Sequence, residues 1–127
     1  MDISIIQSDI DFSIFIGRKV TDIIPVGKEL FKVKFNKGSL NIECSWRLRN
    51  KNGLIIGCSE PSDSDFVAII KKYLLNVSIT NIYHFESTCD LIIEFNNDKY
   101  YLDLFSDSSM FEQYQLNNED NEFLIGR

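Results

Sequence analysis

The sequence predicts an α+β fold that is mainly β: two tandem copies of a helix plus about five antiparallel strands, related by a pseudo-twofold axis. The first observation is a hairpin pattern over residues 90–105, where apolar side chains alternate on either side of a polar turn at residues 96–98. A fainter copy of this pattern lies at residues 30–44. The second observation is that residues 16–23 match residues 75–82 at an offset of 59 positions. Together they indicate that a unit larger than one hairpin is repeated.

The first copy begins with a short predicted helix over residues 8–16. Ser8 is placed as its N-cap, Asp11 lies at its third position, and Gly17 follows its end. Alternating apolar residues bounded by Gly, Pro and Asn then predict strands at residues 20–26, 30–35, 39–49 and 54–58.

The second copy begins after residues 60–65, a segment of Pro, Ser and acidic residues that precedes the clearest helix. The apolar face of this helix recurs at spacings of three and four residues: Phe66, Ile69, Ile70, Tyr73 and Leu74. Lys71 and Lys72 lie near its C-terminus, where the helix dipole favours cations. Strands are then predicted at residues 77–85, 91–95, 100–105, 110–116 and 122–125.

The two predicted copies span about residues 8–58 and 62–126 of a single domain that takes in residues 1–127. Each copy alone would bury little apolar surface, so we expect the copies to share their apolar faces and to bury Phe35 and Phe95 at equivalent places. The alternative is that the match reflects only the general likeness of one hairpin to another. A groove where the copies meet would be a natural ligand site.

Composition is that of a globular protein, with 44% hydrophobic and 25% charged residues. We expect neither a signal peptide nor a membrane-spanning helix, because Asp9 and Asp11 interrupt the early isoleucines. Cys44, Cys58 and Cys89 are odd in number and lack a paired spacing. We therefore expect reduced thiols in a cytoplasmic protein.

Charge is unevenly distributed along the chain. Residues 1–64 carry eight acidic and nine basic side chains, a net charge of +1, whereas residues 65–127 carry eleven acidic and four basic side chains, a net charge of −7. The acidic half repels the phosphates of nucleic acids and of anionic membranes, so we expect neither as a partner. It favours a basic protein partner, or it serves solubility alone.

The sequence contains no recognisable catalytic or metal-binding motif. His84 is the only histidine, which excludes a multi-histidine metal site, and a packed or rim position is expected for it. The cysteines lack a zinc spacing, and the glycines form no phosphate-binding loop. Asp103 and Glu112 could be imagined as an acid and base, but nothing distinguishes them from acids that coat a sheet face. We therefore expect a protein that is not an enzyme and that uses no metal or cofactor.

The run Trp46-Arg47-Leu48-Arg49 places an aromatic ring among basic side chains and permits two interpretations. The ring could stack on a nucleobase or on the guanidinium group of a partner. Alternation favours the other interpretation, in which Trp46 points into the core with Cys44 and Leu48 while Arg47 and Arg49 remain outside.

An acidic and aromatic cluster near the C-terminus is the predicted partner-binding surface. Carboxylates contribute association rate and specificity, and aromatic rings contribute anchors. The predicted residues are Asp107, Phe111, Glu112, Tyr114, Glu119, Asp120 and Glu122. The alternative is a solvated edge whose aromatic side chains turn inward.

Residues 90–95, 102–106 and 111–116 resemble small, uncharacterised bacterial proteins, some of which lie in toxin–immunity gene neighbourhoods. Those proteins carry a similar acidic strand, a Leu-x-x-Phe motif and a Glu-x-aromatic motif, in which the aromatic residue is often tryptophan and here is Tyr114. The resemblance implies an immunity-type binding protein. With the acidic charge, it leads us to expect a protein that occludes a basic toxin effector, and we expect a monomer or homodimer. Two other functions stay open: a small-molecule-binding or enzymatic domain that uses the groove between the copies, and a structural homodimer formed through an exposed sheet edge.

Overall fold

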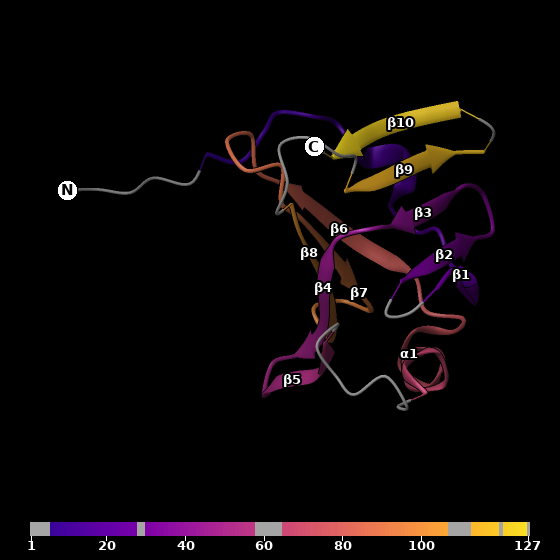
Figure 1. Cartoon of the computed structure of the whole chain (residues 1–127). Coiled ribbons are helices and arrows are strands. Elements are labelled where there is room, and N and C mark those ends of the chain that lie inside the picture. The colour runs from indigo at the N-terminus through magenta and orange to yellow at the C-terminus, as the bar shows by residue number, and fades with distance from the viewer. Residues whose placement is uncertain (1–5, 28–29, 58–64, 107–112, 120, 127) are drawn as a thin grey trace.

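The computed structural model describes residues 6–27, 30–57, 65–106, 113–119 and 121–126. Over these residues the fold is mainly β, with two antiparallel five-stranded sheets and one α-helix (Figure 1). The strand order is β1-β2-β3-β9-β10 in sheet 1 and β5-β4-β8-β7-β6 in sheet 2. The predicted class, a mainly β protein of antiparallel strands, is confirmed.

The first half of the chain contributes the 3₁₀ helix η1 (Ser13–Phe15) and the strands β1 (Val20–Pro25), β2 (Phe31–Phe35), β3 (Ser39–Ile42), β4 (Ser45–Asn50) and β5 (Gly53–Gly57). The second half contributes α1 (Phe66–Leu74) and the strands β6 (Ile79–His84), β7 (Leu91–Phe95), β8 (Tyr100–Phe105), β9 (Tyr114–Asn118) and β10 (Asn121–Gly126).

Each sheet combines three consecutive strands from one half of the chain with a hairpin from the other half. In sheet 1, β3 pairs with β9, and in sheet 2, β8 pairs with β4. Irregularities in strand pairing also correspond between the halves. The register of β1 on β2 shifts between Val20 and Asp22, and that of β6 on β7 shifts between Ile79 and Asn81. Neither five-stranded sheet can therefore form from one half alone.

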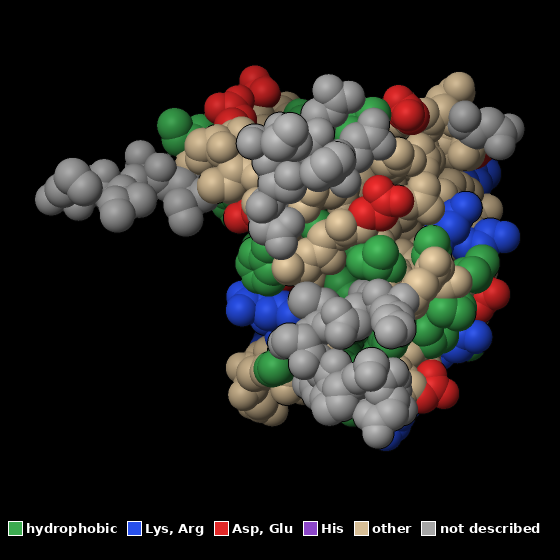
Figure 2. All heavy atoms as spheres, viewed as in Figure 1, with side chains coloured by type: hydrophobic (Ala, Val, Ile, Leu, Met, Phe, Trp, Pro, Cys, Tyr) green, Lys and Arg blue, Asp and Glu red, His purple; other side chains and the backbone are tan. Residues whose placement is uncertain are grey.

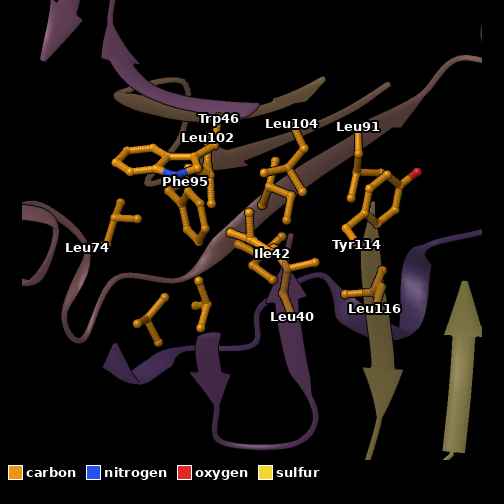
Figure 3. Packing of buried hydrophobic residues seen from close by; sticks show 14 of the residues in the cluster. Leu40, Ile42, Trp46, Leu74, Leu91, Phe95, Leu102, Leu104, Tyr114 and Leu116 are labelled. Carbon is orange, nitrogen blue, oxygen red and sulfur yellow. The ribbon is translucent and has the colours of Figure 1, made fainter. Parts of the chain in front are cut away.

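The hydrophobic core lies between the two sheets, where side chains from both inner faces meet (Figure 3). Phe35 pairs with Val20 in sheet 1, and Phe95 pairs with Ile79 in sheet 2. The two phenylalanines are 5% and 0% exposed, so their predicted burial is confirmed. Burial of a side chain of this size stabilises a fold by roughly 1.5–3 kcal/mol.

Helix α1 packs on both sheets at one end of the core. Asp65 caps it, because its Oδ1 accepts a hydrogen bond from the backbone N–H of Ala68 at 3.1 Å. The ring of Phe66 then lies with its centroid 6.0 Å from that of Phe31 in sheet 1 and 5.7 Å from that of Trp46 in sheet 2. No helix among the described residues is long and apolar enough to cross a membrane.

The predicted helix over residues 8–16 is wrong, because only the three residues of η1 are helical there. Ser8 does not cap it: the Ser8 N–H donates to the carbonyl oxygen of His84 at 2.7 Å, which ties this segment to β6. The carboxylate of Asp11 instead accepts from the Ser13 N–H at 2.9 Å. A hydrogen bond across only two residues tightens one turn and does not open a longer helix.

The predicted strand over residues 39–49 is two strands, which belong to different sheets. β3 ends at Ile42 in sheet 1, and β4 begins at Ser45 in sheet 2. Ile42, Cys44 and Trp46 are 1%, 5% and 2% exposed, so the alternation of buried residues continues through the crossing. Because both sheets face the same core, the sequence pattern cannot reveal the change of sheet. The predicted strand residues 58 and 110–112 lie outside the described part of the chain.

Candidate functional site

The predicted partner-binding residues do not all lie on one described surface. Glu119 and Glu122 are exposed, at the turn between β9 and β10 and at the start of β10. Tyr114, at the start of β9, is fully buried. The other predicted residues lie outside the described part of the chain: Asp107, Phe111, Glu112 and Asp120.

Tyr114 is a core residue, which corrects its assignment as an exposed aromatic anchor. Its hydroxyl donates to the carbonyl oxygen of Cys89 at 2.8 Å. Burial raises the pKa of this phenol well above its usual value, so the hydroxyl stays a donor. Any Cβ at Gly126, which pairs with Tyr114, would overlap the aromatic ring. The alternative of an inward-turned aromatic side chain therefore holds for this residue.

The outer face of sheet 2 carries an ion cluster built on β4 and β8. Asp103 is only 1% exposed and lies opposite Arg47 in the register of the two strands. Its Oδ2 accepts hydrogen bonds from the Nε of Arg47 and the Nε of Arg49, both at 2.6 Å. These distances are those of charge-assisted hydrogen bonds. Glu112, the imagined partner of Asp103 in an acid–base pair, lies outside the described residues.

Aromatic rings hold both guanidinium groups in place. The Cζ of Arg47 lies 4.9 Å from the ring centroid of Phe105, and the Cζ of Arg49 lies 4.3 Å from that of Tyr101. The arginine side chains remain 49% and 30% exposed. We call Arg47, Arg49, Tyr101, Asp103 and Phe105 the arginine–aromatic surface.

Strand alternation explains why these side chains share the outer face. Trp46 and Leu48 are 2% and 0% exposed and point into the core, which confirms the interpretation that alternation favoured. The Trp46 ring meets that of Phe31 edge to face, with centroids 4.9 Å apart. The arginines between and after these residues must then point outward.

The corresponding place on sheet 1 carries neutral amides. Asn41 lies on β3 between the buried Leu40 and Ile42, as Asp103 lies between two buried leucines on β8. It pairs across the strands with Gln115 of β9, and its Nδ2 donates to the Gln115 Oε1 at 3.3 Å. The two sheets thus place a polar pair at the same register position, but only sheet 2 makes it ionic.

A groove of about 630 Å³ lies at one end of sheet 2. Its lining combines residues from both halves of the chain: Asn50, Lys51, Asn52, Tyr73, Asn96, Asn97, Asp98, Lys99 and Tyr100. The Nζ of Lys51 lies 3.1 Å from the Oδ2 of Asp98, which links the two turns that form its walls. Amide groups that both donate and accept hydrogen bonds suit a polar ligand.

His84 is a packed residue, as expected, and is 6% exposed. Its Nδ1 lies 2.9 Å from the Oγ of Ser8, whereas its buried Nε2 has no hydrogen-bond partner among the described residues. Burial lowers the pKa of this imidazole, against the opposing effect of the carboxylates of Glu86 and Asp90. The described part of the chain contains no group of three or more His, Cys, Asp or Glu residues that could hold a metal ion.

Comparison of the chain with protein-family models, curated proteins and solved structures finds no match. The site is therefore defined by its own geometry. Sequence reasoning placed Arg47 and Arg49 outside and named Asp103, but it did not join them. The two hydrogen bonds join residues that are 56 and 54 positions apart in the sequence. No local signal specifies the pairing of strands so far apart.

Proposed function

We propose that this protein acts by binding and not by catalysis, and that its acidic surface holds a basic protein, such as a bacterial toxin effector, in the manner of an immunity protein. The observation that supports this is the state of its carboxylates. Glu119 and Glu122 are exposed and make no ion pair with any described residue. They remain free to attract a cationic partner.

Other carboxylates are already neutralised within the molecule. Asp103 pairs with two arginines, and Asp98 lies 3.1 Å from Lys51. These pairs join basic residues of the first half to acidic residues of the second. Glu119 and Glu122 are in none of these pairs, and Figure 2 shows acidic side chains on several parts of one face, some of them at the top of the view near the place of β10 in Figure 1.

Association kinetics with a partner co-purified from the host would test this function. Neutralising the acidic turn with Glu119→Gln and Glu122→Gln should slow association about threefold to tenfold at low salt, because long-range attraction steers the encounter. The effect should shrink in high salt, which screens charges beyond a Debye length. The fold should persist, since exposed charges contribute little to stability.

A matched control raises the net charge by the same two units, but away from the β9–β10 turn. Ala68→Lys and Asn52→Lys each replace an exposed neutral residue, on α1 and on the β4–β5 turn. This variant should associate at nearly the wild-type rate. Equal slowing by both variants would mean that net charge and not the β9–β10 turn governs association, and an association rate indifferent to salt would reject the proposal.

The groove at the end of sheet 2 supports a second function, the binding of a small polar molecule. The observation that favours it is a volume of about 630 Å³, which falls within the range of ligand sites. A thermal-shift screen of polar metabolites would test it, with Tyr73→Ala as the variant that opens the groove wall. A ligand whose stabilising effect persists in that variant would not be bound there.

We also infer that the two halves descend from one duplicated unit and retain a pseudo-twofold axis. Reciprocal backbone hydrogen bonds support this: the Gly17 N–H donates to Ile79 at 2.7 Å, and the Asn76 N–H donates to Val20 at 2.9 Å. Each donor and each acceptor is displaced from its counterpart by the same 59 positions that the sequence match gives. Reciprocity of this kind is the mark of a twofold contact. An experimental structure whose halves fail to superpose, with Phe35 on Phe95, would reject the inference.

A further inference from the structure

The arginine–aromatic surface carries an unbalanced positive charge. Two guanidinium groups meet one carboxylate, so Arg47, Arg49 and Asp103 together keep a net charge of +1. Both arginines use Nε on the same oxygen, Oδ2, and neither makes the two-bond fork that arginine can form with a carboxylate. Apart from these two Nε contacts, neither arginine has a hydrogen bond from its Nη groups to a described residue. One further negative charge would balance the cluster.

The two arginines are already ordered for binding. Each is held by its bond to Asp103 and by an aromatic ring, Phe105 for Arg47 and Tyr101 for Arg49. Immobilising a long side chain on binding costs conformational free energy. Because these contacts already order both side chains in the free protein, binding of an anion would not have to immobilise them.

Charge at this position distinguishes sheet 2 from sheet 1. Sheet 1 fills the matched place with Asn41 and Gln115, joined by a neutral hydrogen bond. Burying a carboxylate carries a desolvation cost that neutral amides avoid. A role in binding would account for an ionic cluster where sheet 1 uses amides.

From these observations we propose that the outer face of sheet 2 is a docking surface for an acidic segment of a partner protein, whose Asp or Glu carboxylate binds between Arg47 and Arg49. The planar guanidinium fork matches a carboxylate, and Arg and Tyr are the residue types most enriched at the energetic centres of interfaces. Charge complementarity selects the ligand: the local charge of +1 is matched by the single negative charge of one Asp or Glu carboxylate.

This proposal is independent of the basic partner proposed above. Glu119 and Glu122 lie on the β9–β10 hairpin of sheet 1, and the arginine–aromatic surface lies on sheet 2. Either surface can fail its test while the other passes. A single partner with charges of both signs could engage both surfaces.

The test is an NMR titration of the full chain with acetylated hexaglutamate as the probe. The Nε–H signals of Arg47 and Arg49 report directly on the site, and saturable shifts of both are expected. Acetylated hexalysine should leave them unmoved, and a single-stranded DNA hexamer should bind more weakly than the acidic peptide. Tighter binding of the DNA would overturn the proposal in favour of a nucleic-acid surface, and unmoved Nε–H signals with hexaglutamate would overturn it outright.

The decisive variant replaces the ion cluster with the amides that occupy the matched positions of sheet 1. Arg47→Gln, Arg49→Asn and Asp103→Asn copy Gln115, Asn117 and Asn41, and leave no buried charge unpaired. Hexaglutamate affinity should fall about tenfold or more, the loss of at least one charge-assisted contact. Unchanged affinity in a folded variant would overturn the proposal.

A control removes positive charge from the other sheet. Lys32→Gln and Lys34→Gln lower the net charge by two on β2, whereas the amide variant lowers it by only one. Affinity for hexaglutamate should stay within about twofold of wild type if long-range attraction is the only change. An equal or larger loss in this control would show that hexaglutamate responds to net charge, and would overturn the assignment of the site.

Discussion

Sheet 1 and sheet 2 share a backbone plan and differ in the chemistry of their outer faces. Both pair three consecutive strands with a hairpin from the other half of the chain, and both place a polar residue between two buried apolar residues at the central strand. Sheet 1 puts Asn41 there, and sheet 2 puts Asp103 between two arginines. The inward positions are constrained by one common core, and the outward positions are not. Chemistry specific to one sheet is therefore the better guide to function.

The largest expected effect comes from separating the halves that each sheet combines. Residues 1–59 and 60–127 expressed as separate chains should each remain unfolded, because each half holds three strands of one sheet and two strands of the other. The loss is the whole stability of the domain, about 5–15 kcal/mol. Circular dichroism and denaturant titration measure it.

Mixing the two fragments is the matched control for that experiment. The mixture should recover the signal of the intact chain, since both sheets can then form across fragments. A cooperative unfolding transition in either fragment alone would contradict the exchange of hairpins between halves.

A smaller effect compares two core positions, one in each sheet. Phe95→Ala should destabilise the protein by about 3–5 kcal/mol, because it leaves a cavity beneath a side chain that is 0% exposed. Phe35→Ala should cost slightly less, since Phe35 is 5% exposed. Urea denaturation of both variants measures the difference in free energy of unfolding. A loss in free energy of unfolding below about 0.5 kcal/mol at either position is typical of a surface substitution. It would mean that the two sheets do not depend equally on the core.

Local pattern predicts much of each sheet and little of how the sheets are assembled. The hairpin at Leu91–Phe95 and Tyr100–Phe105 follows from alternation and from a turn of Asn and Asp, whose three residues all adopt positive φ. The division of residues 39–49 between two sheets does not, because alternation continues through Cys44. Pairings such as β3 with β9 depend on packing across the whole chain.

Local pattern likewise predicts some features of the candidate site and not others. Alternation is sufficient to place Arg47 and Arg49 outside and Trp46 inside. It also puts Asp103 on an outer face, but only the pairing of β4 with β8 brings it to the arginines. Tyr114 shows the converse, because its acidic neighbours in sequence indicate a surface whereas its strand position requires burial.

The smallest expected effect concerns a titratable group that only sheet 2 carries. His84 ends β6 opposite Leu91, and the residue that ends β1 opposite Phe31 is Pro25. Burial lowers the pKa of His84 in the folded protein, so the unfolded chain, with its ordinary pKa of about 6.5, takes up the proton first as the pH falls. The contribution of neutral His84 to stability is complete above about pH 6.5 and is lost below it, by at most about 1.4 kcal/mol per pH unit. Urea denaturation between pH 7.5 and 5.5 measures this slope, and His84→Gln should flatten it. Identical slopes for the variant and the wild type would place the pH dependence on groups other than His84.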